Sequence, residues 1–365
     1  MYFAARQACQ PGGPRVTRVV VRRTKSRLSS RTLNVVAAFH AMSRPRCYIS
    51  FTSALIAVIF AAPELRSAEC PTLASIVQTD GMLLPFAEYK DGSWKTTWVT
   101  DEAPPVSGWA ASDNPAYQKS MPLSDVPQKW TGYPSNRLAR WYLSSVARHN
   151  ATLHVDHAGM FPIHCGQTWG LATDMPKRSW KSFPIQKAGV AFTSPQEFHG
   201  MMSVVRKGKR FATLSSYVRS VFGPLHQKAV EDYTGPQAPQ SNVEIRAWAT
   251  ESPIDGRTWY YVQARRSYGV ARDAEPAAKC ELISFLTAWL EGAESHPLKM
   301  ISHRFFKTDC DMQEVSTEQP FGVLHLEGRN YLFTQINGYE DETYRISTVD
   351  SEGLHSVLEA SGGGC

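Results

Sequence analysis

Residues 153–166, LHVDHAGMFPIHCG, hold the densest group of reactive side chains in the sequence. Side chains alternate along a strand, so a strand here would project His154 and Asp156 from one face, while His157 points the other way or begins a turn. Imidazoles and carboxylates bind divalent metals, and His164 would supply a further ligand. We therefore name His154, Asp156, His157 and His164 as candidate catalytic residues, and His154, Asp156 and His164 as candidate metal ligands.

The motifs of well-defined catalytic sites do not accompany this segment. The sequence has no HExxH, no CxxC, no Gly-x-Ser-x-Gly and no glycine-rich phosphate loop. Cys165 adjoins His164, but neighbouring residues in a strand point apart, so a thiolate–imidazole pair is disfavoured. The alternative interpretation, that these histidines lie on the surface or at a loop edge, therefore stays open.

Two groups of neighbouring acids offer other chemistry. Asp309 and Asp311 form one group, and Glu340, Asp341 and Glu342 form the other within the segment YEDETY. Glycoside hydrolysis needs two carboxyl groups roughly 5–10 Å apart across a cleft, whereas neighbouring acids on one strand or loop are usually a solvated edge. The YEDETY segment is a better candidate for calcium binding than for catalysis.

Residues 42–70, MSRPRCYISFTSALIAVIFAAPELRSAEC, are typical of a secretory signal peptide. Two arginines precede an uncharged apolar run that is too short for the roughly 30 Å hydrocarbon core of a bilayer, and small residues follow it. We predict a signal peptide over 42–68, with cleavage after Ser67 or Ala68. Residues 1–41 contain eight basic residues and no acid, so we interpret them as an over-extended start or a leader.

The predicted leader explains the basic character of the whole chain. The formal net charge is +6, but residues 1–68 carry eleven basic residues and one acid, which leaves −4 for the remainder. The basic charge therefore does not indicate a nucleic-acid partner. No transmembrane anchor is expected after cleavage.

Five of the seven cysteines follow the predicted signal peptide. An exported chain meets an oxidising environment, which favours disulfides and leaves one thiol over from an odd number. We predict disulfides between Cys280 and Cys310 and between Cys70 and Cys165. Cys365, after three glycines, stays unassigned.

The strongest periodic signals are β-hairpins. Alternating apolar and polar residues flank Asp91-Gly92, Asp255-Gly256 and Glu327-Gly328, which are residue pairs suited to tight turns. Helical spacing of apolar residues predicts helices over 194–208, 213–222 and 281–292, the second ended by Gly223-Pro224. The predicted fold class is therefore α+β and β-rich, with antiparallel hairpins at both ends of the mature chain and two or three helices between.

The segment Asp232–Asn242, DYTGPQAPQSN, reads as a surface linker. It separates a predicted N-terminal α+β region, 69–235, from a predicted C-terminal β-rich region, 243–360, although one continuous domain is also compatible with the sequence.

These features favour an exported, periplasmic or extracellular, binding or interaction protein. Its ligand would be a small molecule, a glycan or a protein, since abundant aromatic rings suit such surfaces. The sequence assigns no cofactor. The alternative function is an exported hydrolase with the His/Asp site named above, with or without a metal.

Overall fold

The computed structural model describes the chain from Pro71 onward with several gaps, and Pro71–Cys365 cluster as one unit. The described residues are 71–78, 81–97, 110–111, 119–144, 151–163, 166–175, 188–230, 242–252, 256–268, 283–293, 296–308, 315–350 and 352–364. The predicted signal peptide, all seven cysteines with both predicted disulfides, His164, Asp309 and Asp311 lie outside these ranges.

Six antiparallel strands close into a small barrel, because each pairs with the next and the last pairs with the first. In order around the barrel they are β1 (Thr72–Gln78), β2 (Met82–Lys90), β8 (Gly166–Thr173), β7 (Ala151–Ile163), β6 (Arg140–Ser144) and β9 (Ala188–Phe192). Three shorter strands extend this sheet: β3 (Ser93–Thr96), β4 (Ala110–Ala111) and β5 (Lys119–Pro122).

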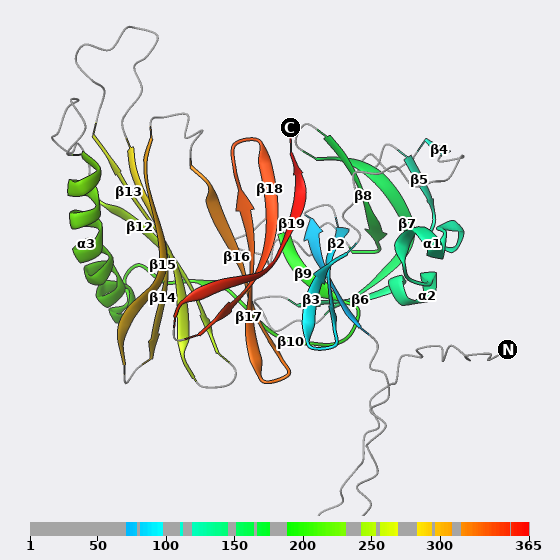
Figure 1. The fold of residues 1–365 in the computed structure, drawn as a ribbon, viewed down its shortest axis with the longest axis horizontal. Helices are drawn as coiled ribbons and strands as arrows, with labels where there is room; N and C mark the ends of the chain where they lie inside the picture. The colour runs from blue at the N-terminus through cyan, green and yellow to red at the C-terminus, as the bar shows by residue number, and fades with distance from the viewer. Residues whose placement is uncertain are drawn as a thin grey trace, which may run out of the picture. The chain divides into compact units, whose positions relative to one another are not determined.

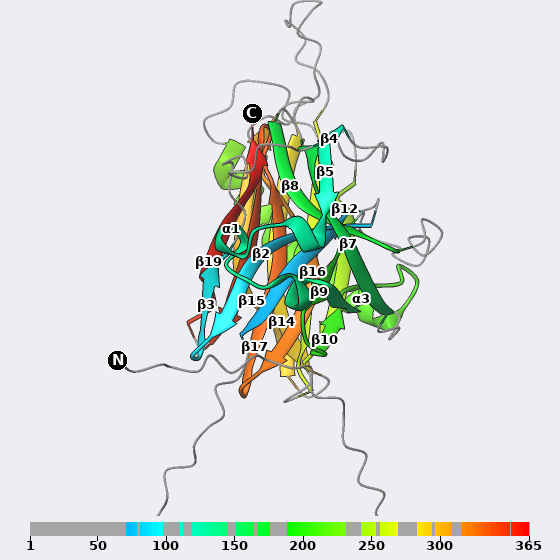
Figure 2. The same ribbon diagram turned by 90° about the vertical axis from the view of Figure 1, so that its right-hand side faces the viewer.

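Side chains alternate along the barrel strands, so apolar residues point both into the barrel and out from it. On β1, Leu73 and Val77 pack into the interior cluster, while Ala74 and Ile76 join a different cluster outside. Three short helical segments add apolar side chains to the interior: η1 (Leu123–Asp125), α1 (Gln128–Thr131) and α2 (Ser135–Leu138). Figure 2 views the molecule from the barrel side, with α1 in front of the strands.

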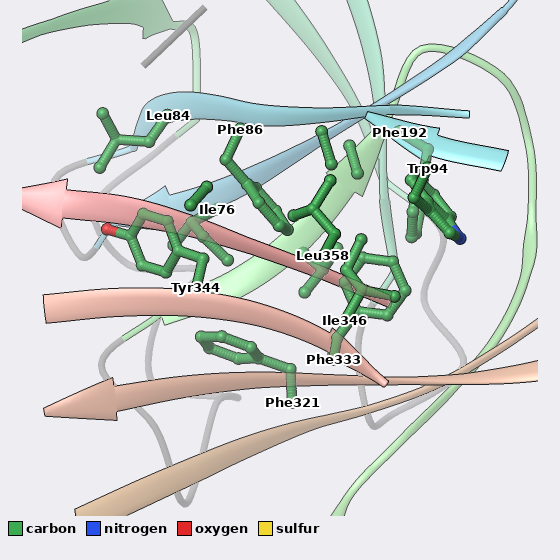
Figure 3. Close-up of a cluster of buried hydrophobic side chains, with 14 of the residues drawn as sticks. Ile76, Leu84, Phe86, Trp94, Phe192, Phe321, Phe333, Tyr344, Ile346 and Leu358 are labelled. Atoms are coloured by element: carbon green, nitrogen blue, oxygen red, sulfur yellow. The ribbon is translucent and has the colours of Figure 1, made fainter. Parts of the chain in front are cut away.

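A second sheet covers the outside of the barrel. Its strands are, in order, β10 (Glu197–Gly200), β16 (Thr317–Leu326), β17 (Arg329–Asn337), β18 (Asp341–Val349) and β19 (Leu354–Gly364). Phe86 on the barrel packs between Phe333 and Tyr344 of this sheet, with ring centroids 6.2 and 5.4 Å away. Figure 3 shows these rings converging from both sides into one apolar layer.

A third sheet packs on the other face of the second. It consists of β11 (Met202–Ser203), β12 (Glu244–Glu251), β13 (Thr258–Ser267), β14 (Ile283–Ala293) and β15 (His296–Thr308). Trp259, Tyr261 and Trp289 of the third sheet meet Val323 and Leu332 of the second. The helix α3 (Lys209–Val230) covers the opposite face, so helix, third sheet, second sheet and barrel follow one another across Figure 1.

The β-rich, antiparallel character predicted from sequence is confirmed. Asp91-Gly92 and Glu327-Gly328 turn their hairpins with positive φ at both residues, 53° and 76° in the first and 49° and 76° in the second. Strands β12 and β13 form the third predicted hairpin, with Gly256 at φ 65°. Every described range contains at least one strand. Strands of the predicted N-terminal region, 69–235, pair with strands of the predicted C-terminal region, 243–360: β10 pairs β16, and β11 pairs β12.

The helix predicted over 213–222 is confirmed, but its predicted end at Gly223-Pro224 is wrong. Helix α3 continues through Pro224 to Val230. A proline at this position removes one backbone hydrogen bond, yet Phe222 and Leu225 on either side of the Gly-Pro pair pack against the third sheet. Packing therefore outweighs the local stop signal.

The helices predicted over 194–208 and 281–292 are wrong, since these segments form β10, β11 and β14. In β14, Leu286 and Leu290 face α3, while Phe285 and Trp289 point to the other side of the sheet. A strand buried on both faces carries apolar residues at every spacing. The helical spacing of apolar residues in 281–292 is therefore a coincidence and does not indicate a helix.

Two glycine substitutions should have very different effects on stability. A Cβ at Gly170 of β8 would lie 2.5 Å from the Leu83 carbonyl oxygen, whereas a Cβ at Gly223 in α3 would meet nothing within 4 Å outside its own stretch of helix. We expect Gly170→Ala to destabilise the protein by about 1–3 kcal/mol. Gly223→Ala should change the stability by less than about 1 kcal/mol, because the gain in helix propensity is offset by the contact of the new Cβ with the Pro224 ring. Denaturant unfolding measures both, and equal effects at the two sites would contradict this packing.

Acid should weaken the packing of α3 through His226. Its ring stacks on Tyr268 at 4.5 Å, and its Nδ1 lies 3.0 Å from the Ser284 hydroxyl and 2.9 Å from the Tyr268 hydroxyl. Burial, and then the charge of Arg266, lowers the pKa of His226. The unfolded chain therefore takes up this proton first, so the stabilising contribution is complete above a pH of about 6.5 and is lost as the pH falls below it.

Thermal unfolding as a function of pH tests this role. The melting temperature of the parent should fall between about pH 7.5 and about pH 5 more steeply than that of His226→Phe. The exposed His303 on β15 is the matched control, and His303→Gln should follow the parent curve. Parallel curves for the parent and His226→Phe would refute the assignment.

Candidate functional site

The histidine candidates on β7 lie on the outside of the barrel. Val155 and Ala158 both pack into the barrel interior, because a β-bulge lies between Val155 and His157. The bulge places Asp156 and His157 on the same outer side, with His157 Nδ1 3.1 Å from Asp156 Oδ1, which corrects the prediction that His157 points away. His154 is exposed, and its backbone N–H donates to Asp174 Oδ1 at 2.9 Å.

These candidates do not form a metal centre among the described residues. No group of three His, Cys, Asp or Glu side chains suited to a metal ion occurs in the described part of the chain. His164 lies outside that part. In YEDETY, Glu340 and Asp341 are exposed, and Glu342 accepts a hydrogen bond from the Tyr344 hydroxyl, so these acids lie at a turn and at the first residues of β18.

A cleft with a volume of about 210 Å³ opens at one end of the third sheet, beside the start of β16. Four of its six lining residues have charged or amide side chains, and the other two contribute a phenyl ring and a hydroxyl. The six lining residues are Glu244, Arg246, Gln263, Arg265, Phe285 and Thr317.

Strand alternation explains why polar groups gather in the cleft. On β12, Ile245 and Ala247 pack toward α3, so Glu244 and Arg246 must face the other way. Cross-strand pairing then sets Glu244 opposite Arg265 and Arg246 opposite Gln263. Phe285 stands next to Arg265 on the following strand and packs with Val315, which gives the cleft an apolar wall.

The two arginines give the cleft a positive character. Arg246 and Arg265 are both exposed, and neither forms an ion pair with any residue in the described ranges. Glu244 is the single carboxylate among the six lining residues. Two guanidinium groups in a cleft that a phenyl ring also lines are suited to bind a planar anionic group such as a carboxylate.

A buried hydrogen-bond network extends inward from the cleft. Gln263 Nε2 donates to the Tyr261 hydroxyl at 3.5 Å, and the backbone N–H of Glu318 donates to the same oxygen at 3.2 Å. Trp289 Nε1 donates to Glu318 Oε2 at 2.7 Å. Arg345 completes the network, 3.7 Å from Glu318 Oε1.

The network is suited to structural support rather than proton transfer. Burial, and then the charge of Glu318, raises the pKa of Tyr261 well above its usual value, so the phenol stays neutral at physiological pH. Glu318 is 9 % exposed and forms one ion pair with Arg345 on β18 and one hydrogen bond with Trp289 on β14 of the third sheet. The network therefore fixes the position of the strands that carry the cleft.

Comparisons with known proteins add no function. The chain matches no protein-family model, no curated protein and no solved structure. Within the described residues, no helix combines the length and apolarity that crossing a bilayer requires.

Sequence reasoning missed the cleft although part of the signal was present. Residues 243–247, VEIRA, alternate apolar and charged side chains, which predicts a strand with one charged face. Arg265 lies across the hairpin that the sequence predicts around Asp255-Gly256. Phe285 and Thr317 come from strands whose pairing the sequence does not reveal, and the sequence pattern of 281–292 predicts a helix.

Removing the Glu318 carboxylate should strongly destabilise the contact between the second and third sheets. Glu318→Ala leaves the buried Trp289 N–H without its acceptor and removes one of the two carboxylates that pair with Arg345, so we expect a loss of about 2–4 kcal/mol. Glu318→Gln keeps an acceptor and should lose less. The control is Glu359→Gln, because Glu359 binds Arg345 at 2.7 Å from a half-exposed position and should cost less than about 1 kcal/mol. Urea unfolding measures all three, and equal losses would contradict the network.

Proposed function

We propose that this chain is an exported binding protein whose ligand carries an anionic group held in the cleft by Arg246 and Arg265. The observation that supports the proposal is the pair of exposed guanidinium groups without ion-pair partners among the described residues, beside Phe285. Guanidinium groups bind carboxylates with paired hydrogen bonds. The lone Glu244 beside them would disfavour a ligand with a high negative charge.

The size of the cleft limits what enters it. A volume of about 210 Å³ is below the range of roughly 300–1,000 Å³ that is typical of sites for drug-sized ligands. A small organic acid, the acidic end of a glycan or an acidic side chain of a protein would fit. The small molecule, the glycan and the protein expected as ligands from the sequence could thus all bind here through an acidic group.

Export and processing belong to the same proposal. The signal peptide over 42–68, the disulfides Cys280–Cys310 and Cys70–Cys165, and the α+β arrangement with hairpins at both ends of the mature chain are predictions from the sequence alone. The cleft itself requires none of these cysteines, since all six of its lining residues lie on described strands.

The alternative function, an exported hydrolase with His154, Asp156, His157 and His164, stays a prediction. The structure describes His154 and Asp156 as exposed groups on the outer side of the barrel, and His157 beside them is partly exposed. His164 lies outside the described residues.

Binding of small organic acids tests the proposed function. Thermal-shift and calorimetric titrations would use acetate, succinate, glucuronate and inorganic phosphate as probes. We expect at least one carboxylate to bind, and Arg246→Gln and Arg265→Gln each to weaken that binding roughly tenfold or more, because each removes a charged hydrogen bond. Arg329→Gln, at an exposed arginine on β17 outside the cleft, is the matched control.

Two results would contradict the proposal. One is the absence of binding by all four probes at millimolar concentration. The other is a carboxylate whose affinity is the same for the parent, Arg246→Gln and Arg265→Gln.

A further inference from the structure

A tight turn before α3 exposes apolar and cationic side chains together. Met202 and Val205 are 55 % and 74 % exposed, and they are two of the four large exposed apolar side chains in the described ranges. Arg206, Lys207, Lys209 and Arg210 are all exposed as well. We call residues 202–210 the basic turn.

The protein holds the basic turn in a fixed conformation. Met201 on its N-terminal side is buried, and its N–H donates to the Phe321 carbonyl at 2.9 Å. Val204 donates to the Ala247 carbonyl at 2.9 Å, and Gly208 donates back to the Val205 carbonyl at 3.1 Å. The exposed side chains are therefore presented on an ordered backbone, so little conformational entropy is lost when they bind a partner.

Most of the positive charge in the basic turn is uncompensated within the described residues. Arg210 lies 4.0 Å from Glu251, while Arg206, Lys207 and Lys209 form no ion pair there. Lys209 and Arg210 also begin helix α3, whose first turn contains no acid. Cations at a helix N-terminus oppose the helix dipole, so their placement does not serve the stability of α3.

We propose that the basic turn docks on a membrane surface that contains anionic phospholipids. Basic side chains bind the phosphate layer, and Val205 and Met202 enter the boundary between headgroups and acyl chains. A nucleic acid or an acidic protein surface would attract the cations but would give the two apolar side chains no comparable environment.

The expected binding is weak and reversible. Each basic residue near an anionic surface contributes roughly a fivefold increase in partition coefficient, and this contribution falls with ionic strength. Two apolar side chains add to the affinity without making the attachment permanent. The docking surface does not share residues with the cleft, so this inference does not depend on the proposed function.

Vesicle co-sedimentation of the full chain tests the inference. The chain should bind vesicles of phosphatidylcholine with phosphatidylglycerol, should bind pure phosphatidylcholine much less, and should be released by molar salt. The triple variant Arg206→Gln, Lys207→Gln, Lys209→Gln should lose roughly a hundredfold in partition coefficient. Val205→Ser should lose severalfold at unchanged charge. All variants carry the same N-terminal segment, so differences between them report on the turn.

Matched controls separate the turn from general charge effects. The triple variant Lys90→Gln, Lys95→Gln, Arg329→Gln removes three exposed cations from two other hairpins and should bind like the parent. Three results would overturn the inference: no dependence on phosphatidylglycerol, equal losses in the two triple variants, or binding to soluble polyglutamate as tight as to vesicles and unaffected by Val205→Ser. The last result would indicate a site for polyanions instead.

Discussion

The structure depends on the burial of both faces of the sheet β16–β19. Phe333 and Tyr344 pack on one face against the barrel, while Val323 and Leu332 pack on the other against the third sheet. Alternation along a strand makes this possible, because neighbours such as Leu332 and Phe333 belong to different layers. The barrel and the third sheet therefore both need the second sheet as their partner. Helix α3 covers the other face of the third sheet.

Polar groups between the sheets fix their register where apolar contacts alone would not. Trp289 donates to Glu318 across the interface, and Arg345 pairs with the same carboxylate from β18. On the barrel side, the Tyr89 hydroxyl donates to Glu327 Oε2 at 2.6 Å, which links a barrel strand to a turn of the second sheet. Such contacts are directional, and the buried one at Glu318 is costly to break, so they favour a single arrangement of the layers.

Local sequence signals predicted the features that depend on local chemistry and failed where packing decides. Asp91-Gly92 and Glu327-Gly328 were identified as hairpin turns because positive φ is a property of the residue pair itself. The segment 281–292 was assigned to a helix because a strand buried on both faces has no alternation to recognise. For the site, the charged face of 243–247 and its hairpin partner strand with Arg265 can be predicted from the sequence, but the position of Phe285 beside them depends on a strand pairing that the sequence does not reveal.

The cleft follows from the same layered arrangement. Where the second sheet covers the third, the third sheet presents the aromatic rings of Tyr261 and Trp289. At the start of β16, beside Thr317, the facing side chains on those same strands change to Gln263, Arg265 and Phe285. This face of the third sheet therefore changes from aromatic to charged residues at the place where the second sheet stops covering it. Exposed guanidinium groups at that border are not needed to hold the layers together, which is why we assign them to a ligand.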